Sequence, residues 1–503
     1  MKTFSLTLMA ALVIVPLIHA NEAAPGHLDF KAESGLTAEK LAAGNSEEII
    51  LQADFAASLG NFNHQPGRAL SATPGRSSMS EEEWQQLKAL RFEYVRLWLM
   101  VPLVLNPETK KETFGNVVMA NYFAKYSAIT QKILVNFPFG KHYRELVAKG
   151  KWTEAEYTDE MTKLLEYFKR HYPKIEFIEI DNEPNAAGEK PAEYYLTYSK
   201  ACSVVAKINS KIAAGSLPGP VLKVGGPTLY KMDMTEFNKW LEPFLGAYAS
   251  DSSSYKRLDF ISYHQYLLRE NPKLQDGDIF KDSPARVAGE RAMIDAALKA
   301  RGLPVVPFMI TEGGLYAGEQ PEPTPSRDFF IKAAGQLALD YFYLNQTGII
   351  PYRWTVDGIQ PVKCLFARDE NGKWTGEPRP FYHATYFETQ LPAQRYASET
   401  LLDAKGLGIG TLAGGSSRKV AVLAWNYQWK NAAVKNFKLN LKNLPTDFQL
   451  NPVHVKVQAV RQTRDHGAPN LEREEDIAPA KNFSLPIHLG PNEFLFIELS
   501  VAN

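Results

Sequence analysis

The feature that most constrains the fold is a series of short apolar runs that recurs through most of the chain. Each run is rich in Val, Ile, Phe and Tyr and is continuous rather than alternating, which is the pattern of strands covered on both faces. Successive runs lie about 43 residues apart, enough for one strand, one helix and two loops. The spacing predicts a βα repeat with eight strands, at residues 49–55, 92–100, 133–139, 175–180, 221–224, 258–263, 305–310 and 348–354.

Helix signals lie between these runs. Ser80 followed by Glu83 has the pattern of a capping box, Pro325 opens a stretch with apolar residues at helical spacing, and residues 191–212 have the pattern of a further helix. The α/β alternation favours a (β/α)8 TIM barrel, over residues 49–395, rather than a doubly wound open sheet. No Gly-x-Gly-x-x-Gly pattern follows the first run, so nothing supports a dinucleotide cofactor.

The C-terminal part has a different pattern. Short strand-like segments alternate there with turn clusters such as Gly414-Gly415-Ser416-Ser417. This predicts a C-terminal all-β sandwich domain over residues 396–503. Its apolar faces call for more strands than this stretch supplies, so residues 28–48 either cross back to join it or form only a leader to the barrel.

The first twenty residues resemble a cleavable export signal. Lys2 precedes an apolar run that ends at Ala20, before polar residues. The run is short for a membrane span, so we expect no stable membrane anchor. We expect residues 1–20 to be a signal peptide and the mature chain to be periplasmic or extracellular; the alternative is a buried first strand or helix.

Charge and cysteine content exclude several classes of partner. The chain has 56 basic and 56 acidic side chains and a sequence pI near 7.2, so it lacks the long-range attraction that nucleic acid or an anionic membrane needs. Its two cysteines, Cys202 and Cys364, are too few for a disulfide scaffold, and no C-x-x-C pair offers a zinc site. We expect no metal and no cofactor. The oligomeric state stays open.

Two glutamates stand where apolar strands become polar loops. The fourth run ends in Glu179-Ile180-Asp181-Asn182-Glu183-Pro184, and the seventh ends in Ile310-Thr311-Glu312. In a barrel of this kind the carboxyl ends of the strands converge on one cleft, and strands four and seven face each other across it. Two carboxyl groups in one cleft predict hydrolysis of a glycosidic bond, in which one acid protonates the leaving oxygen and one carboxylate attacks or activates water. Either glutamate alone could instead cap a helix or pair with an arginine.

With these residues in view, the chain resembles the retaining glycoside hydrolases of clan A. Within that clan it is most similar to glycoside hydrolase family 39, which holds β-xylosidases and α-L-iduronidases. The resemblance covers roughly residues 49–427. It is carried by Gly67-Arg68-Ala69, Trp84 and Leu87, Tyr94-Val95-Arg96, Asn182-Glu183-Pro184-Asn185, His264, Tyr266 and Ile310-Thr311-Glu312.

The sequence departs from the xylosidase pattern at two positions. Leu97-Trp98 follows Arg96, where family members commonly carry a His-Gly pair that contacts the sugar, and Asp181 precedes Asn182, where a tryptophan is usual. These changes leave the catalytic glutamates in place and leave open the sugar, its linkage, its anomeric configuration, and exo or endo action.

The resemblance implies a role for each site residue. Glu312 would be the nucleophile and Glu183 the acid/base of a double displacement. Arg96 and Tyr266 would hold Glu312 ionised and oriented, and Asn182 would bind the sugar 2-hydroxyl. Trp354 is expected to form an apolar platform. Further candidate substrate contacts near the same end of the barrel are His264, His64, Tyr230 and Tyr316.

Alternatives remain for both the residues and the function. Arg96 could be an ion pair at the barrel mouth, His264 a structural histidine and Trp354 a core aromatic residue. The chain could be a noncatalytic carbohydrate-binding barrel protein, although that class predicts a damaged catalytic set. A metal-dependent barrel hydrolase is the other alternative, and the ten scattered histidines speak against it.

Overall fold

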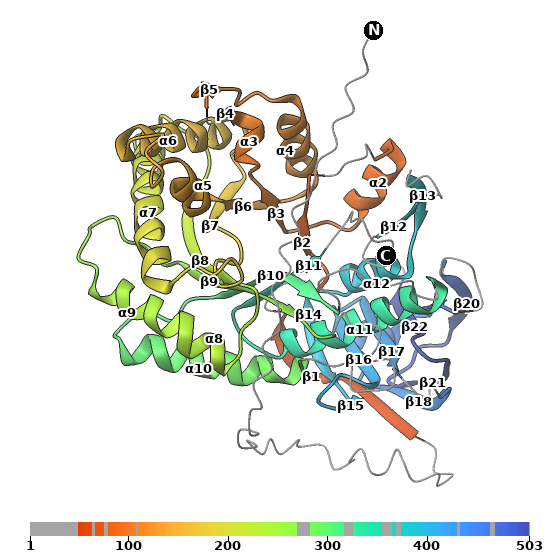
Figure 1. Cartoon of the computed structure of the whole chain (residues 1–503). Coiled ribbons are helices and arrows are strands. Elements are labelled where there is room, and N and C mark those ends of the chain that lie inside the picture. Colours follow the sequence, from red (N-terminus) through yellow and green to blue (C-terminus); the bar gives the residue numbers. More distant parts are fainter. Residues whose placement is uncertain are drawn as a thin grey trace. The chain divides into compact units, whose positions relative to one another are not determined.

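The structure of the chain is a computed structural model. It describes residues 49–62, 66–74, 79–106, 108–268, 282–315, 325–354, 365–368, 374–429, 433–462 and 468–501. Figure 1 shows a strand barrel with surrounding helices and a second region built of strands. None of the helices among the described residues has the length and hydrophobicity needed to cross a membrane.

Eight parallel strands close into a barrel, which confirms the predicted TIM barrel. Strand β11 pairs with β2 through Arg353 opposite Leu70 and Trp354 opposite Ser71, and this pairing closes the ring. In chain order the strands are β2 (Ala69–Ala72), β3 (Tyr94–Trp98), β6 (Lys132–Phe137), β7 (Ile175–Ile180), β8 (Lys223–Leu229), β9 (Phe260–Tyr266), β10 (Phe308–Gly314) and β11 (Ile349–Trp354).

The predicted first barrel strand was wrong. Residues 49–55 belong to β1 (Ile49–Asn61), which pairs with β14 (Gln394–Ser398) and β18 (Lys435–Lys442) in the C-terminal sheet. Leu51, Ala53 and Phe55 are buried on alternate positions of β1, the pattern of a strand with one covered face. The true first strand, β2, has only four residues. Because β2 takes the place of the predicted first strand, Glu183 still follows the fourth barrel strand, and Glu312 lies near the carboxyl end of the seventh.

Helices cover the outside of the barrel. Among them, α2 begins with the capping box predicted at Ser80 and Glu83, and α7 matches the helix predicted at 191–212. They are α2 (Glu81–Ala89), α3 (Val101–Val104), α4 (Val117–Ile129), α5 (Phe139–Leu146), α6 (Glu154–His171), α7 (Pro191–Ala213), α8 (Met234–Glu236), η1 (Phe237–Leu241), α9 (Glu242–Ser250), η3 (Pro284–Arg286), α10 (Val287–Ala300), α11 (Pro325–Leu344) and α12 (Pro380–Gln390). Two small hairpins, β4 (Leu105–Asn106) with β5 (Lys111–Glu112) and β12 (Phe366–Arg368) with β13 (Trp374–Pro378), lie in loops.

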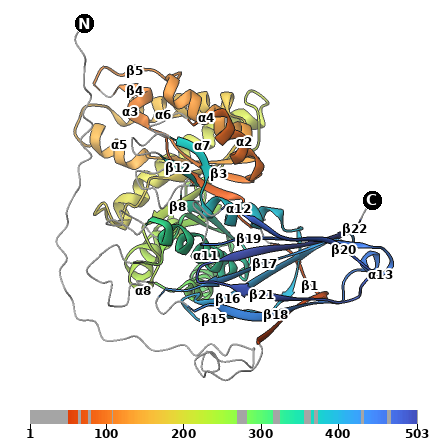
Figure 2. The ribbon, with the colours of Figure 1, turned by 90° about the vertical axis from the view of Figure 1, so that its right-hand side faces the viewer.

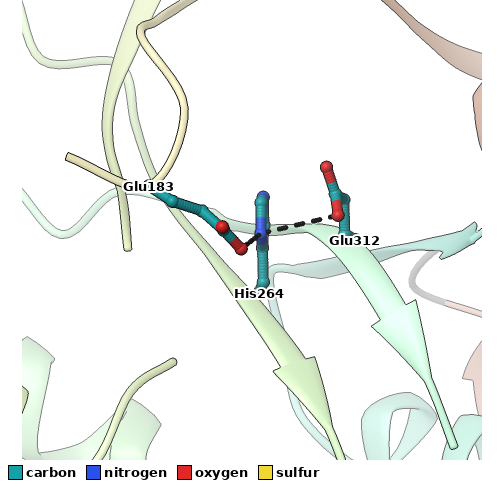
Figure 3. Close-up of side chains that lie close together, drawn as sticks. All are labelled: Glu183, His264 and Glu312. Atoms are coloured by element: carbon teal, nitrogen blue, oxygen red, sulfur yellow. Dashed lines mark hydrogen bonds and ion pairs between the residues drawn. The ribbon is translucent and has the colours of Figure 1, made fainter. Parts of the chain in front are cut away.

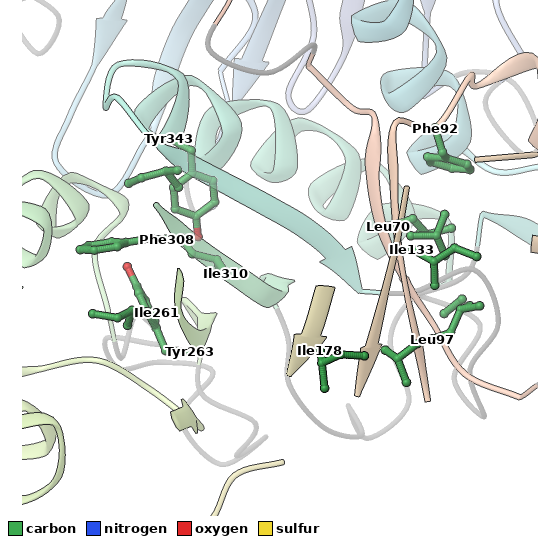
Figure 4. Packing of buried hydrophobic residues seen from close by; sticks show 14 of the residues in the cluster. Leu70, Phe92, Leu97, Ile133, Ile178, Ile261, Tyr263, Phe308, Ile310 and Tyr343 are labelled. Carbon is green, nitrogen blue, oxygen red and sulfur yellow. The ribbon is translucent and has the colours of Figure 1, made fainter. Parts of the chain in front are cut away.

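Successive side chains on each barrel strand face opposite sides. Ile133, Ile178 and Ile261 pack outward into the main cluster (Figure 4). A separate cluster of Ala69, Leu134, Phe177, Phe260, Met309 and Tyr352 fills the interior. Because side chains alternate along a strand, Glu179 shares the interior face of Phe177, and His264 and Tyr266 share that of Phe260.

The C-terminal domain is all-β apart from the short helix α13 (Thr446–Leu450), as predicted. Hydrogen bonds join its strands into one ten-stranded mixed sheet, in which β1 runs parallel to β18. One apolar cluster takes residues from both ends of the strand order, Phe437 of β18 and Val455 of β19 among them. The remaining strands are β15 (Leu401–Leu402), β16 (Gly408–Gly415), β17 (Lys419–Tyr427), β19 (Val453–Val460), β20 (Asn470–Ile477), β21 (Phe483–Leu489) and β22 (Phe494–Val501).

This sheet packs against the last two barrel helices. Tyr341 of α11 lies 6.4 Å from Trp425 of β17, and Phe387 of α12 lies 5.2 Å from Phe496 of β22, between ring centroids. Figure 2 shows α11 and α12 beside the sheet. The signal peptide predicted at 1–20 and the strand suggested at 28–48 lie outside the described residues.

Candidate active site

Two glutamates and a histidine meet at the carboxyl ends of three barrel strands. His264 Nδ1 lies 2.7 Å from Glu183 Oε1 and 3.7 Å from Glu312 Oε2. In Figure 3 the imidazole ring lies between the two carboxylates. One oxygen of each glutamate and one nitrogen of the histidine all lie within 4.8 Å of one another. The structure therefore brings together the two glutamates that the sequence singled out.

A bulge in β10 brings Glu312 into this site. Strict alternation would put Glu312 on the same face as Ile310, which packs outward against the helices. The pairing of β10 with β9 shifts register between Ile310 and Glu312, and its pairing with β11 shifts between Ile310 and Gly313. Such a bulge re-aims the side chains that follow it. Glu312 consequently shares the interior side with His264 and Tyr266.

Arg96 is the centre of the charge network. Its Nε donates to Glu179 Oε2 at 2.6 Å, Nη1 donates to Glu312 Oε1 at 2.8 Å and Nη2 donates to Asn182 Oδ1 at 2.8 Å. The guanidinium is fully buried. Burial would lower the pKa of Arg96, but the charges of Glu179 and Glu312 outweigh it and raise that pKa. One cation therefore balances two buried carboxylates and holds Asn182.

The Arg96 contact also fixes the orientation of Asn182. A guanidinium can only donate hydrogen bonds, so the atom of Asn182 that faces it is the amide oxygen. The amide nitrogen is left to donate to another acceptor. This orientation suits the contact with a sugar 2-hydroxyl that the family resemblance implies.

Tyr266 and His264 complete the surroundings of the glutamates. Tyr266 donates from its hydroxyl to Glu312 Oε2 at 2.8 Å. Burial and the charge of Glu312 raise the pKa of Tyr266 well above its ordinary value, so the phenol stays a neutral donor. Burial would lower the pKa of His264, but the charge of Glu312 and the contact with Glu183 outweigh it and raise that pKa.

The two glutamates have different environments. The Glu312 side chain is 8% exposed, whereas that of Glu183 is 34% exposed. Glu183 has a left-handed backbone, with φ of 48°, and its N–H donates to Thr228 O of β8 at 2.9 Å. One carboxylate is therefore enclosed by donors, and the other lies on a turn that reaches solvent.

Sequence reasoning missed Glu179. This residue lies inside β7, fully buried, and also accepts from Asn136 Nδ2 at 3.1 Å. Burial would raise the pKa of Glu179, but the Arg96 charge outweighs it and lowers that pKa. The available signal was an acidic residue in an apolar run, because a buried charge requires a partner.

An aromatic pair lies next to Arg96. Trp98 and Trp354 have ring centroids 6.4 Å apart, and the guanidinium carbon of Arg96 lies 4.7 Å from the Trp98 centroid. Both indoles are half-buried. The predicted platform residue Trp354 is thus close to the charge network, and Trp98 joins it at the position where the sequence departs from family 39.

The other candidate residues have separate outcomes. Tyr230 follows β8, and its N–H donates to Asn185 Oδ1 at 3.1 Å, so its backbone joins the loop that follows Glu183. His64 and Tyr316 lie outside the described residues. Cys202 is buried in α7, and burial raises the pKa of its thiol to about 12, so the thiol stays protonated at neutral pH.

Comparison with known proteins supports the fold. No protein-family model matches the chain, and no curated protein matches it in sequence. A monomeric β-xylosidase from Caulobacter crescentus CB15 is 15% identical, with a TM-score of 0.65 over 90% of this chain and 100% of that chain. The GH39 enzyme from Xanthomonas axonopodis pv. citri is 14% identical, with a TM-score of 0.66 over 92% of this chain and 99% of that chain.

A third solved structure is described as the bacterial orthologue of human α-L-iduronidase. It is 10% identical, with a TM-score of 0.64 over 91% of this chain and 84% of that chain. These identities are low, so the likeness concerns the fold. Over about nine-tenths of its length, the chain has the barrel and β-domain architecture of solved GH39 glycoside hydrolases.

Proposed function

We propose that this protein is a retaining glycoside hydrolase, with Glu312 as nucleophile and Glu183 as acid/base. The observation that carries the proposal is the approach of one oxygen of each carboxylate to within 4.8 Å. Retaining glycosidases hold their two carboxyl groups about 5 to 5.5 Å apart, whereas inverting enzymes need about 6.5 to 9.5 Å to admit a water molecule. The close approach of these two oxygens supports the shorter of the two separations, and with it direct attack by a carboxylate.

In the first step a Glu312 oxygen bonds to the anomeric carbon while the bond from that carbon to the leaving oxygen breaks. Glu183 gives its proton to the leaving oxygen. In the second step water attacks the anomeric carbon and gives a proton to Glu183, and the ester bond to Glu312 breaks. Both side chains return to their starting states.

The surrounding residues fit these two roles. Arg96 and Tyr266 each donate to a different oxygen of Glu312, which restrains the carboxylate and leaves a lone pair on each oxygen for attack. The more exposed Glu183 is open to the water needed in the second step. The Asn182 amide nitrogen is oriented to bind a sugar hydroxyl. Restraint of this kind lowers the reorganisation that the transition state requires.

The substrate class follows from the same features. The relatives named as β-xylosidase and α-L-iduronidase orthologue support a glycoside or oligosaccharide as substrate. Trp98 and Trp354 are suited to the apolar face of a sugar ring. We also propose, from the signal-like residues 1–20, that the enzyme is exported.

A second candidate is favoured by one observation. Glu183, His264 and Glu312 could together hold a metal ion, as a metal-dependent hydrolase requires. Against this, the Glu312 oxygens already accept from Arg96 and Tyr266, and the Arg96 cation lies 2.8 Å from one of them. Full activity after treatment with a strong chelator would exclude the metal candidate, and loss restored by a divalent cation would favour it.

The main test combines a panel of glycosides with two variants. Proton NMR of the first-formed sugar should show the same anomeric configuration as the substrate, and the opposite anomer would overturn the retaining mechanism. Glu312→Ala should lose nearly all turnover on every substrate. Glu183→Ala should lose far more kcat/KM on a glycoside with a poor leaving group than on an activated aryl glycoside, because only the poor leaving group needs the proton. Saccharide binding without turnover by the unaltered protein would favour a noncatalytic binding protein.

A further inference from the structure

Helix α5 is capped by a residue from another element. The helix begins after Pro138, which provides no side-chain cap. Asp181, in the turn after β7, supplies it: Oδ1 and Oδ2 accept from the Gly140 N–H at 2.9 and 3.0 Å, and Oδ1 accepts from the Lys141 N–H at 3.2 Å. A carboxylate is favoured here because the first amides of a helix lack internal partners and carry partial positive charge.

The surroundings of the Asp181 carboxylate are closely fitted. A Cβ atom on Gly140 would lie 2.3 Å from Asp181 Oδ2 and 2.7 Å from Thr197 Oγ1. Burial raises the pKa of Asp181 to about 6. The hydrogen bonds from the Lys141 and Gly140 amides and the charge of Arg144 oppose this rise. At neutral pH the group is therefore mostly ionised and able to accept these bonds.

Asp181 also begins the turn that carries Glu183. Asp181 and Glu183 both have left-handed backbones, with φ of 59° and 48°, which the surrounding structure must hold in place. The Asp181 N–H donates to Phe137 O at 3.0 Å, and its carbonyl accepts from Asn136 Nδ2 at 2.5 Å. At the other end, Glu183 N–H is held by Thr228 O. The Asp181 side chain adds an anchor from this turn to α5.

We propose that Asp181 is a positioning residue for the acid/base, because its carboxylate ties the turn at residues 181–183 to the first amides of α5 and so aims Glu183 at the leaving oxygen. This inference rests on the proposed function. It assigns a role to the aspartate that stands where family 39 commonly has a tryptophan. The role is indirect, since Asp181 contacts the helix rather than the substrate.

The test compares Asp181→Asn with Glu183→Ala and a matched control. The isosteric amide keeps one acceptor but turns an NH2 group toward backbone donors, so the turn loses part of its anchor. We expect kcat/KM, which reports the first step alone, to fall about 10- to 100-fold on a glycoside with a poor leaving group and less than about 3-fold on an activated aryl glycoside. Glu189→Gln is the control, because it removes a nearby buried carboxylate that pairs with Arg144 rather than with the helix amides. It should show no dependence on the leaving group.

A second variant protects the test against poor folding of the first. Gly140→Ala keeps the aspartate but pushes its carboxylate away from the helix, so it should show the same dependence on the leaving group. The positioning role would be overturned if the folded variants lost kcat/KM equally on both substrates. It would also be overturned if they lost no kcat/KM at all. If Glu183→Ala itself shows no such dependence, the proposed function fails instead, so the two failures are distinguishable.

Discussion

The Tyr266 hydroxyl donates to Glu312 Oε2 at 2.8 Å across two adjacent barrel strands. Both side chains are buried, so the bond forms in a medium where a charge-assisted hydrogen bond is strong. Arg96 holds the other oxygen of the same carboxylate. The orientation of Glu312 is therefore set by one neutral and one cationic donor, and their contributions can be separated by substitution.

Replacing Tyr266 with phenylalanine removes the neutral donor and keeps the ring. A hydrogen bond to a charged group contributes about 1.5 to 3 kcal/mol, which corresponds to about a 10- to 100-fold loss in kcat/KM. Steady-state kinetics on an aryl glycoside measure this loss, with circular dichroism to check the fold. An unchanged kcat/KM would show that the Tyr266 hydroxyl does not act on Glu312 during catalysis.

Replacing Arg96 with methionine should destabilise the fold as well as abolish activity. The change leaves Glu179 and Glu312 buried without their cation, and breaking a buried ion pair in this way costs about 3 to 5 kcal/mol. Urea unfolding measures the loss. Arg170→Met is the control, because its pair with Glu166 lies on the surface and its side chain is 51% exposed; its midpoint should hardly move. Equal shifts for the two variants would contradict a central role for Arg96.

The two tryptophans should differ in their kinetic effects. Trp98 covers the Arg96 guanidinium at 4.7 Å, a cation–π contact of about 0.5 to 2 kcal/mol, so Trp98→Leu should lower kcat through Arg96. Trp354→Leu is the matched variant, because it removes the other indole of the aromatic pair. Among the described residues that indole has no cation–π contact with Arg96. This variant should mainly raise KM. Identical changes in kcat and KM for both variants would show that the indoles act only as a shared platform.

Glu290 should make the stability of the protein depend on pH. Burial and the nearby Asp282 raise the pKa of Glu290 to about 8, although Arg286 opposes them. The folded state then holds a proton that the unfolded state releases near its ordinary pKa of 4.5, so this group lowers stability as pH rises from about 4.5 to 8. Glu290→Gln removes that loss, and its stability relative to the unaltered protein should increase across this window.

Urea midpoints of both proteins at several pH values measure this difference. Glu193→Gln is the control, because the Glu193 side chain is 58% exposed on α7. The difference between its urea midpoint and that of the unaltered protein should not change with pH. A Glu290→Gln difference that is equally flat would contradict a protonated Glu290 in the folded protein.

The barrel was predictable from the sequence because buried parallel strands leave a strong local signal. Seven of the eight apolar runs are barrel strands. The exception shows the limit of that signal: β2 has only four residues, Ala69–Ala72, whereas β1 is longer and more apolar in appearance but pairs with strands far along the chain. Strand pairing is a tertiary property, and a single run does not encode its partner.

By itself, the sequence determined the alternation of strands and helices, the all-β C-terminal part, and the places of Glu183 and Glu312 at two strand ends, because these depend on local composition and on the geometry common to all such barrels. Only the tertiary structure decided that a bulge turns Glu312 inward, that Glu179 shares Arg96 with it, and that Asp181 caps a helix. Those features join residues that are distant in the chain. Their energies come from burial and ion pairing, which exist only once the chain has folded.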